Sequence, residues 1–171
     1  MATIRTHYLD ASAIIKLLVK EDGSERLRAY CERYSNFRTT SLCVGEALGV
    51  LKVKHFRRKE IDEEGYFAAS EILTSWTDAS GWLEIEEIKI SDRSVFREVE
   101  QLCKKHSLDL CDGLQIYTLK KGFLSVLPGD STPILITADD ALAEAAKGED
   151  GRVWHVLKES EPRPCINDPA L

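Results

Sequence analysis

The sequence contains no continuous apolar stretch of the roughly 18 residues that a membrane-spanning helix needs. Its first residues also lack the charged, apolar and small-residue regions of a secretory signal peptide. With 43% hydrophobic and 30% charged residues over 171 positions, the chain has the composition of a soluble globular protein. We therefore expect a cytoplasmic protein with no membrane partner.

The five cysteines and four histidines are scattered along the chain. No C-x-x-C pair and no H-E-x-x-H sequence occurs, and no histidine has the spacing of a nucleophile–His–Asp arrangement. The pattern argues against a disulfide scaffold and against a zinc ribbon, and it favours reduced, mostly buried thiols.

An excess of positive charge is also missing, since the formal net charge is -6. Proteins that bind nucleic acid through a broad basic face are usually basic, so any contact with a polynucleotide must be local. The densest basic segment is His55–Lys59, which could steer a polyanion or simply form a solvated surface. The overall acidity could likewise reflect a solvated surface, a cluster of carboxylates that binds metal, or both.

Strand-like and helical segments alternate along the chain, without an internal repeat or a linker. Alternation of this kind is typical of an α/β fold in which helices cover both faces of a mainly parallel sheet. We expect one domain over residues 1–158 and an extended, proline-containing tail over 159–171. The expected strands cover 5–9, 37–41, 82–88, 132–137 and 152–157, and the expected helices cover 12–20, 25–33, 42–54, 61–76, 92–105, 109–121 and 141–146.

Four acidic residues are associated with apolar stretches, namely Asp10, Glu46, Asp112 and Asp139. Asp10 directly follows the first expected strand, and ligands of open α/β sheets bind at the carboxyl edge of the strands. We expect the four carboxylates to meet there and to bind Mg²⁺ or Mn²⁺, because these hard cations prefer oxygen ligands and close carboxylates repel one another. One or two such ions would activate water and neutralise charge on a phosphodiester.

Three of these positions also have an ordinary structural interpretation. Asp10 could belong to a helix-entry turn, and Glu46 could interact favourably with the dipole of a helix in its first turn. Asp139 and Asp140 compete for the fourth acidic position, and either could cap the following helix. Asp139 is the preferred ligand and Asp140 the alternative.

The neighbouring polar residues allow two interpretations as well. Ser12 stands where a helix would be capped, although Ser12 and Thr137 could also hydrogen-bond to a carboxylate or to a water on a metal ion. Lys16 could face a scissile phosphate or be an ordinary exposed lysine. Asp109 fits a helix cap better than a metal ligand.

The acidic segments together resemble the motifs of the PIN domain family. The first is closest to VapC-type toxins, also described as PilT N-terminus-like proteins. Order, spacing and strand–helix context match over about residues 5–158. The matching segments are Tyr8-Leu9-Asp10-Ala11-Ser12-Ala13, Glu46 opening a helix after a Thr-Thr-Ser strand, Leu110-Cys111-Asp112-Gly113-Leu114 and Ile136-Thr137-Ala138-Asp139.

The resemblance implies a three-layer α/β/α sandwich, a homodimer and a metal-dependent endoribonuclease that hydrolyses RNA. It also implies the toxin of a type II toxin–antitoxin pair, with a cognate antitoxin protein that occupies the active-site groove. Catalysis and metal binding are then assigned to Asp10, Glu46, Asp112 and Asp139. The chain departs from the family at Gly113, where alanine is common. Because a small residue is kept, we expect little effect.

Two other classes of function remain open. A PIN-like module that binds RNA or a protein partner without cleavage would be expected to lack one of the acids, and all four are present. A phosphohydrolase with an aspartyl nucleophile usually has a second acid two residues after the first. Ser12 occupies that position, which argues against this chemistry.

Overall fold

The structure is a computed structural model, and it describes residues 5–79 and 81–163. Its centre is a sheet of five parallel strands in the order β3-β2-β1-β4-β5. The strands are β1 (His7–Leu9), β2 (Phe37–Thr39), β3 (Leu83–Ile85), β4 (Ile134–Thr137) and β5 (Arg152–His155). The predicted α/β class with a parallel sheet is therefore confirmed.

Helices connect the strands at every crossover, as parallel pairing requires. Three shorter helical segments were not predicted, because they lie within or beside turns. The α-helices are α1 (Ala11–Leu18), α2 (Ser24–Cys31), α3 (Ser41–Lys52), α4 (Glu63–Trp76), α5 (Arg93–His106), α6 (Leu110–Lys121) and α7 (Asp140–Gly148). The short segments are the π-helical turn η1 (Val53–Arg57) and the 3₁₀ turns η2 (Phe123–Val126) and η3 (Gly129–Ser131).

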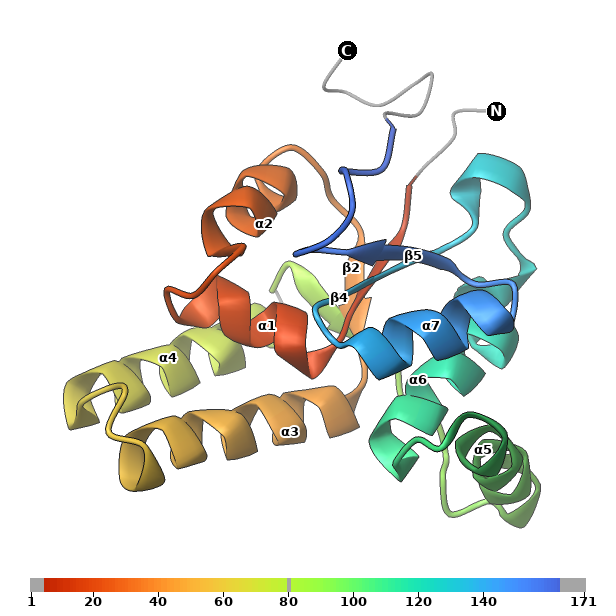
Figure 1. The fold of residues 1–171 in the computed structure, drawn as a ribbon, viewed down its shortest axis with the longest axis horizontal. Coiled ribbons are helices and arrows are strands. Elements are labelled where there is room, and N and C mark those ends of the chain that lie inside the picture. The colour runs from red at the N-terminus through yellow and green to blue at the C-terminus, as the bar shows by residue number, and fades with distance from the viewer. Residues whose placement is uncertain (1–4, 80, 164–171) are drawn as a thin grey trace.

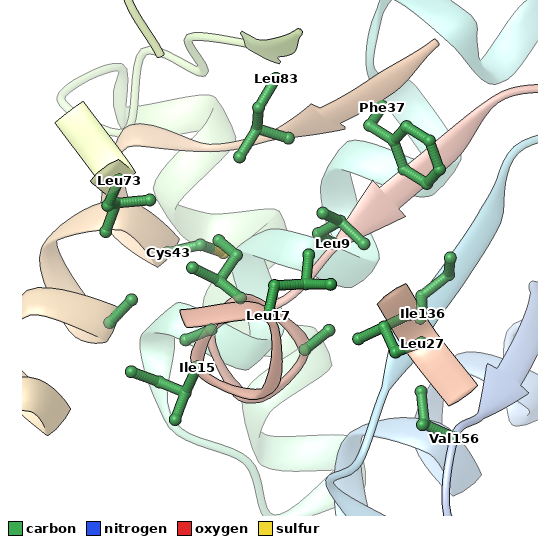
Figure 2. Close-up of a cluster of buried hydrophobic side chains, with 14 of the residues drawn as sticks. Leu9, Ile15, Leu17, Leu27, Phe37, Cys43, Leu73, Leu83, Ile136 and Val156 are labelled. Atoms are coloured by element: carbon green, nitrogen blue, oxygen red, sulfur yellow. The ribbon is translucent and has the colours of Figure 1, made fainter. Parts of the chain in front are cut away.

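Helices cover both faces of the sheet and form a three-layer α/β/α sandwich (Figure 1). Successive strand residues point to opposite faces, so the core divides in two. Leu9 and Ile136 pack with α1, α2, α3 and α4, and Figure 2 shows this larger cluster. Tyr8 and Leu135 pack on the other side with α6 and α7. The predicted sandwich therefore matches the arrangement of the two cores.

Most helices start at an acidic or hydroxyl cap that follows directly on extended backbone. The prediction that Ser12 caps the first helix is wrong, since Asp10 is the cap and accepts a hydrogen bond from the Ala13 amide at 2.7 Å. Aspartate and serine are both good caps, and the choice depends on which residue leaves the strand. Asp109 caps α6 as expected, and Asp139 caps α7. Capping therefore places three acidic side chains at helix N-termini.

Gly113, in α6, lies close to the side chains of α5. A Cβ atom at this position would stand 2.3 Å from Cys103 Sγ and 3.3 Å from Val99 Cγ1. An alanine at this position would therefore require the Cys103 side chain to shift. The glycine that stands in place of the family's alanine therefore allows α5 to lie close to α6.

The end of the domain continues past β5 along the surface. Arg26 and Trp154 donate hydrogen bonds to the Glu159 carbonyl, and Arg33 forms an ion pair with Glu161. Residues 164–171, which include Cys165 and the last two prolines of the expected tail, lie outside the described residues.

The other cysteines, Cys31, Cys43, Cys103 and Cys111, are free thiols, of which only Cys43 is fully buried. Across the described ranges, every helix is too short or too polar to cross a bilayer.

Candidate functional site

Asp10 lies at the centre of the candidate site, directly beyond the carboxyl end of β1. Its side chain is buried, and three groups donate hydrogen bonds to the carboxylate: the Ala13 amide, the Ser12 hydroxyl and the Thr137 hydroxyl. Burial raises the pKa of Asp10 to about 6, while these three hydrogen bonds lower it and the charge of Asp112 raises it further. The carboxylate is therefore oriented by donors, and it forms no ion pair with any cationic side chain in the described part of the chain.

The hydroxyls of Ser12 and Thr137 connect β1 to β4 at this edge. Ser12 Oγ lies 2.9 Å from both Asp10 oxygens and accepts a hydrogen bond from the Ala138 amide at 2.8 Å. Thr137 Oγ1 donates to Asp10 Oδ2 at 2.7 Å and accepts from the Asp139 amide at 2.9 Å. Because each hydroxyl has one proton and accepts an amide N–H, both are set to donate to Asp10.

Asp112 and Glu46 reach the same region from α6 and α3. The pKa of Asp112 is raised to about 7. Partial burial is the largest cause, and the negative charges of Asp109, Asp139 and Glu46 act in the same direction. Partial burial also raises the pKa of Glu46, with the charges of Asp109, Asp10 and Asp139 acting in the same direction. Several of these acids therefore act on one another's pKa, although they come from distant parts of the sequence.

Asp139 and Asp140 take different positions. Asp139 caps α7 through a hydrogen bond from the Leu142 amide, and its charge acts on both Asp112 and Glu46. Asp140 is paired with Lys158 at 2.5 Å, and it lies 2.9 Å from His155 Nε2 without the alignment of a hydrogen bond. Lys158 lowers the pKa of Asp140. The structure therefore groups Asp139, and not Asp140, with the other acids.

Lys16 belongs to a different cluster. It is buried in the last turn of α1 and pairs with Glu21 at 3.3 Å, and Glu21 also pairs with the buried Lys54 at 2.5 Å. Lys16 is thus neither an exposed lysine nor a free cation facing a phosphate. The ion pair with Glu21 was not foreseen, because it depends on the turn between α1 and α2.

Two further acids lie near this edge: Asp109, which the sequence assigned only as a helix cap, and Glu86, which it did not assign. Asp109 contributes negative charge to both Glu46 and Asp112 while it caps α6. Glu86 follows β3 and is buried, but it accepts hydrogen bonds from the Tyr8 hydroxyl and the Phe123 amide. Glu86 therefore connects β3 to β1 and to the start of η2.

The donor set suits a hard cation in chemistry but is not closed in geometry. Among residues 5–79 and 81–163, no group of three or more His, Cys, Asp or Glu side chains could hold a metal as placed. Within the same ranges, Asp10, Glu46, Asp112 and Asp139 form no ion pair with a Lys, Arg or His side chain. Oxygen ligands of this kind fit Mg²⁺ or Mn²⁺, and the side chains of Glu46 and Asp139 are exposed to solvent.

Comparison with known proteins supports the fold alone. No protein-family model matches the chain, and no match is found among curated proteins. A solved structure, described as the crystal structure of PAE2754 from Pyrobaculum aerophilum, is similar with a TM-score of 0.55 and 18% sequence identity. The similarity covers 90% of this chain and 92% of that one, so the architecture is shared over nearly the whole length.

Proposed function

We propose that the protein is a metal-dependent endoribonuclease and the toxin of a type II toxin–antitoxin pair. One observation carries the proposal: acids from four elements gather at the carboxyl edge of the sheet, none of them forms an ion pair with a Lys, Arg or His side chain in residues 5–79 and 81–163, and the pKa of Asp10, Asp112 and Glu46 is raised. Ionised carboxylates in mutual range are unfavourable unless a cation is supplied from outside. The four motifs that resemble the PIN domain family give the toxin assignment.

The residues then divide by role. Asp10, Glu46, Asp112 and Asp139 would hold one or two Mg²⁺ or Mn²⁺ ions. Such an ion, when bound, supplies Lewis-acid activation of water and neutralises charge on the phosphodiester. Ser12 and Thr137 keep the Asp10 carboxylate ionised and fixed in orientation through their hydrogen bonds. Water adds to phosphorus and the P–O3′ bond breaks, which leaves a 5′-phosphate and a 3′-hydroxyl.

A second candidate function is a PIN-like module that binds RNA or a protein without cutting. The observation that favours it is the lack of a closed set of three ligands in the described ranges. Metal titration by calorimetry separates the two candidates. A nuclease should bind Mn²⁺ at a site that Asp112→Asn weakens, whereas an inert module should show no acid-dependent binding.

Cleavage assays test the catalytic proposal. The purified protein, free of partner, is incubated with RNA in Mn²⁺ or in EDTA, and we expect cleavage only with metal. Asp139→Asn should reduce cleavage by at least about 100-fold, because even the loss of an outer-shell partner commonly costs 10- to 100-fold. Asp140→Asn is the matched control, since its side chain pairs with Lys158 instead. Cleavage in EDTA, or equal losses in both variants, would contradict the mechanism.

The toxin role and the homodimer need separate tests. Expression of the wild-type chain should arrest bacterial growth, and Asp112→Asn should relieve the arrest. The neighbouring open reading frame should encode a small DNA-binding protein that suppresses the arrest when it is co-expressed. Light scattering of the purified chain should give twice the mass of the 19.2 kDa protomer.

A further inference from the structure

Exposed aromatic and cationic side chains gather at the turn between α3 and α4, which lies at the far left of Figure 1. Phe56, in η1, is 55% exposed, and Arg57, Arg58 and Lys59 follow it on the surface. Phe67, in α4, is 60% exposed. Exposed aromatic rings beside free cations are typical of surfaces that bind single-stranded nucleic acid.

Phe56 packs against two neighbouring aromatic rings, those of His55 and Tyr66. The rings of His55 and Tyr66 are stacked, with centroids 5.3 Å apart and planes 17° apart. Phe56 packs edge-on against both, at 4.4 Å from His55 and 5.6 Å from Tyr66. His55 is fixed in turn by a 3.0 Å hydrogen bond to the Ile61 carbonyl. Phe56 is thus supported by its neighbours while more than half of its surface stays open.

The cationic side chains of this turn differ in whether they form ion pairs within the protein. Lys54 is buried and pairs with Glu21 and Glu60, and the exposed Arg58 lies 3.6 Å from Glu60. Arg57 and Lys59 form no ion pair with any residue in the described part of the chain. They sit in or beside a π-helical turn, a geometry found frequently at functional sites. Local positive charge is therefore available on a protein whose net charge is -6.

Helix α3 connects this turn to the acidic site. Glu46 and Phe56 are ten positions apart, which corresponds to about 15 Å along a helix axis. We propose that Phe56 stacks on a base of single-stranded RNA and that Arg57 contacts an adjacent phosphate, outside the cleavage site. This inference rests on the proposed ribonuclease function, because it describes how that enzyme would hold its substrate.

Phe67 provides a matched control on the same hairpin. It is as exposed as Phe56, but exposed acids lie one helical turn away on either side: Glu63 and Glu64 before it and Glu71 after it. RNA phosphates would be repelled from Phe67 and attracted to Phe56. An apolar protein partner would be expected to use both rings.

Binding is measured by fluorescence anisotropy with a 5′-labelled single-stranded RNA of mixed sequence, in EDTA so that hydrolysis does not interfere. Phe56→Ala should weaken binding about tenfold, as expected for the loss of one stacked base. Phe67→Ala should change it less than twofold. Arg57→Gln should lower the slope of log K against log salt by about 0.7, as for the loss of one phosphate contact on a single strand. Arg97→Gln, at an exposed arginine of α5, should leave the slope unchanged.

Each other outcome overturns the inference. Equal effects of Phe56→Ala and Phe67→Ala on RNA binding would show that Phe56 and its cations are not the selected contact, and no RNA binding by the wild type would exclude a substrate role for the turn. A cleavage assay in Mn²⁺ distinguishes a failure of this inference from a failure of the ribonuclease proposal. Normal cleavage with no dependence on Phe56 removes only the inference, whereas Phe56-dependent binding without cleavage removes only the ribonuclease.

Discussion

Two groups of acidic side chains in this protein differ in the cations that surround them. Glu149, at the end of α7, contacts Lys105, His106 and Lys120, and its pKa is lowered to about 2, chiefly by the hydrogen bond from Lys105. Asp112, at the other end of α6 from Lys120, has no such partner in the described ranges, and its pKa is raised to about 7. Where the chain supplies cations the acid has a structural role, and where it does not, the proposed metal ion would take their place.

The largest expected effect is stabilisation of the fold by a metal ion, which only the group of acids that contains Asp112 should provide. At a Mn²⁺ concentration of one hundred times Kd, binding should stabilise the wild type by about 2.7 kcal/mol. For a domain of this size, the midpoint of thermal unfolding should rise by about 5–10 °C. Asp112→Asn should reduce the rise, whereas Glu149→Gln should keep it. Equal rises in the wild type and Asp112→Asn would place the ion elsewhere.

The pH dependence of stability should also differ between the wild type, in which Asp10 can ionise, and Asp10→Asn, in which it cannot. The folded pKa of Asp10, about 6, lies above the ordinary aspartate value of 3.8, so its ionisation opposes folding. The contribution is fully present below about pH 4 and is lost as the pH rises through 6. In EDTA, the wild type should therefore lose about 2.4 kcal/mol more than Asp10→Asn between pH 4 and pH 8.

Urea unfolding at the two pH values measures this difference. Asparagine also caps helices well, so the start of α1 is kept in the variant. Burial lowers the pKa of His7 to about 3, which gives the opposite pH dependence below 6.5, but this applies to both proteins and cancels. Parallel pH profiles would show that Asp10 is not destabilised by burial.

The sequence predicted the fold because the information is local. Alternating strand and helix patterns fix a parallel sheet, and the carboxyl ends of parallel strands share one edge, so acids after different strands approach one another. The positions of Asp10 after β1 and of Asp139 after β4 follow from this rule. The choice between Asp139 and Asp140 did not, because it depends on Lys158, which lies beyond β5.

Other features were missed for the same reason. Lys16 is buried by an ion pair with Glu21 across a turn, and Glu149 collects its cations from α5 and α6. Neither pairing leaves a pattern within one segment of the sequence. The close approach at Gly113 is equally non-local, because the atom that excludes a side chain there is Cys103 Sγ on another helix.

Helix α6 connects the two groups of acids, so its packing can be used to perturb both. Gly113→Ala would normally favour a helix by up to about 1 kcal/mol. Here the new Cβ would meet Cys103 Sγ at 2.3 Å, and we expect a net loss of about 2 kcal/mol. Adding Cys103→Ala should restore part of the loss, though Val99 remains at 3.3 Å. Urea unfolding of the four proteins gives the coupling, and additive effects would rule out the contact as the cause.

The smallest expected effect concerns the compensated group itself. The lowered pKa of Glu149 means that its contribution is present above the ordinary glutamate pKa of 4.5 and is lost as the pH falls toward 2. Lys105 and Lys120 are 61% and 39% exposed in their side chains, so solvent screens the pairs. Glu149→Gln should therefore cost only about 1 kcal/mol at pH 7. Glu144→Gln, at an exposed position of α7, is the control. A loss as large as that caused by Gly113→Ala would contradict this expectation, because it would show that solvent does not screen the ion pairs of Glu149.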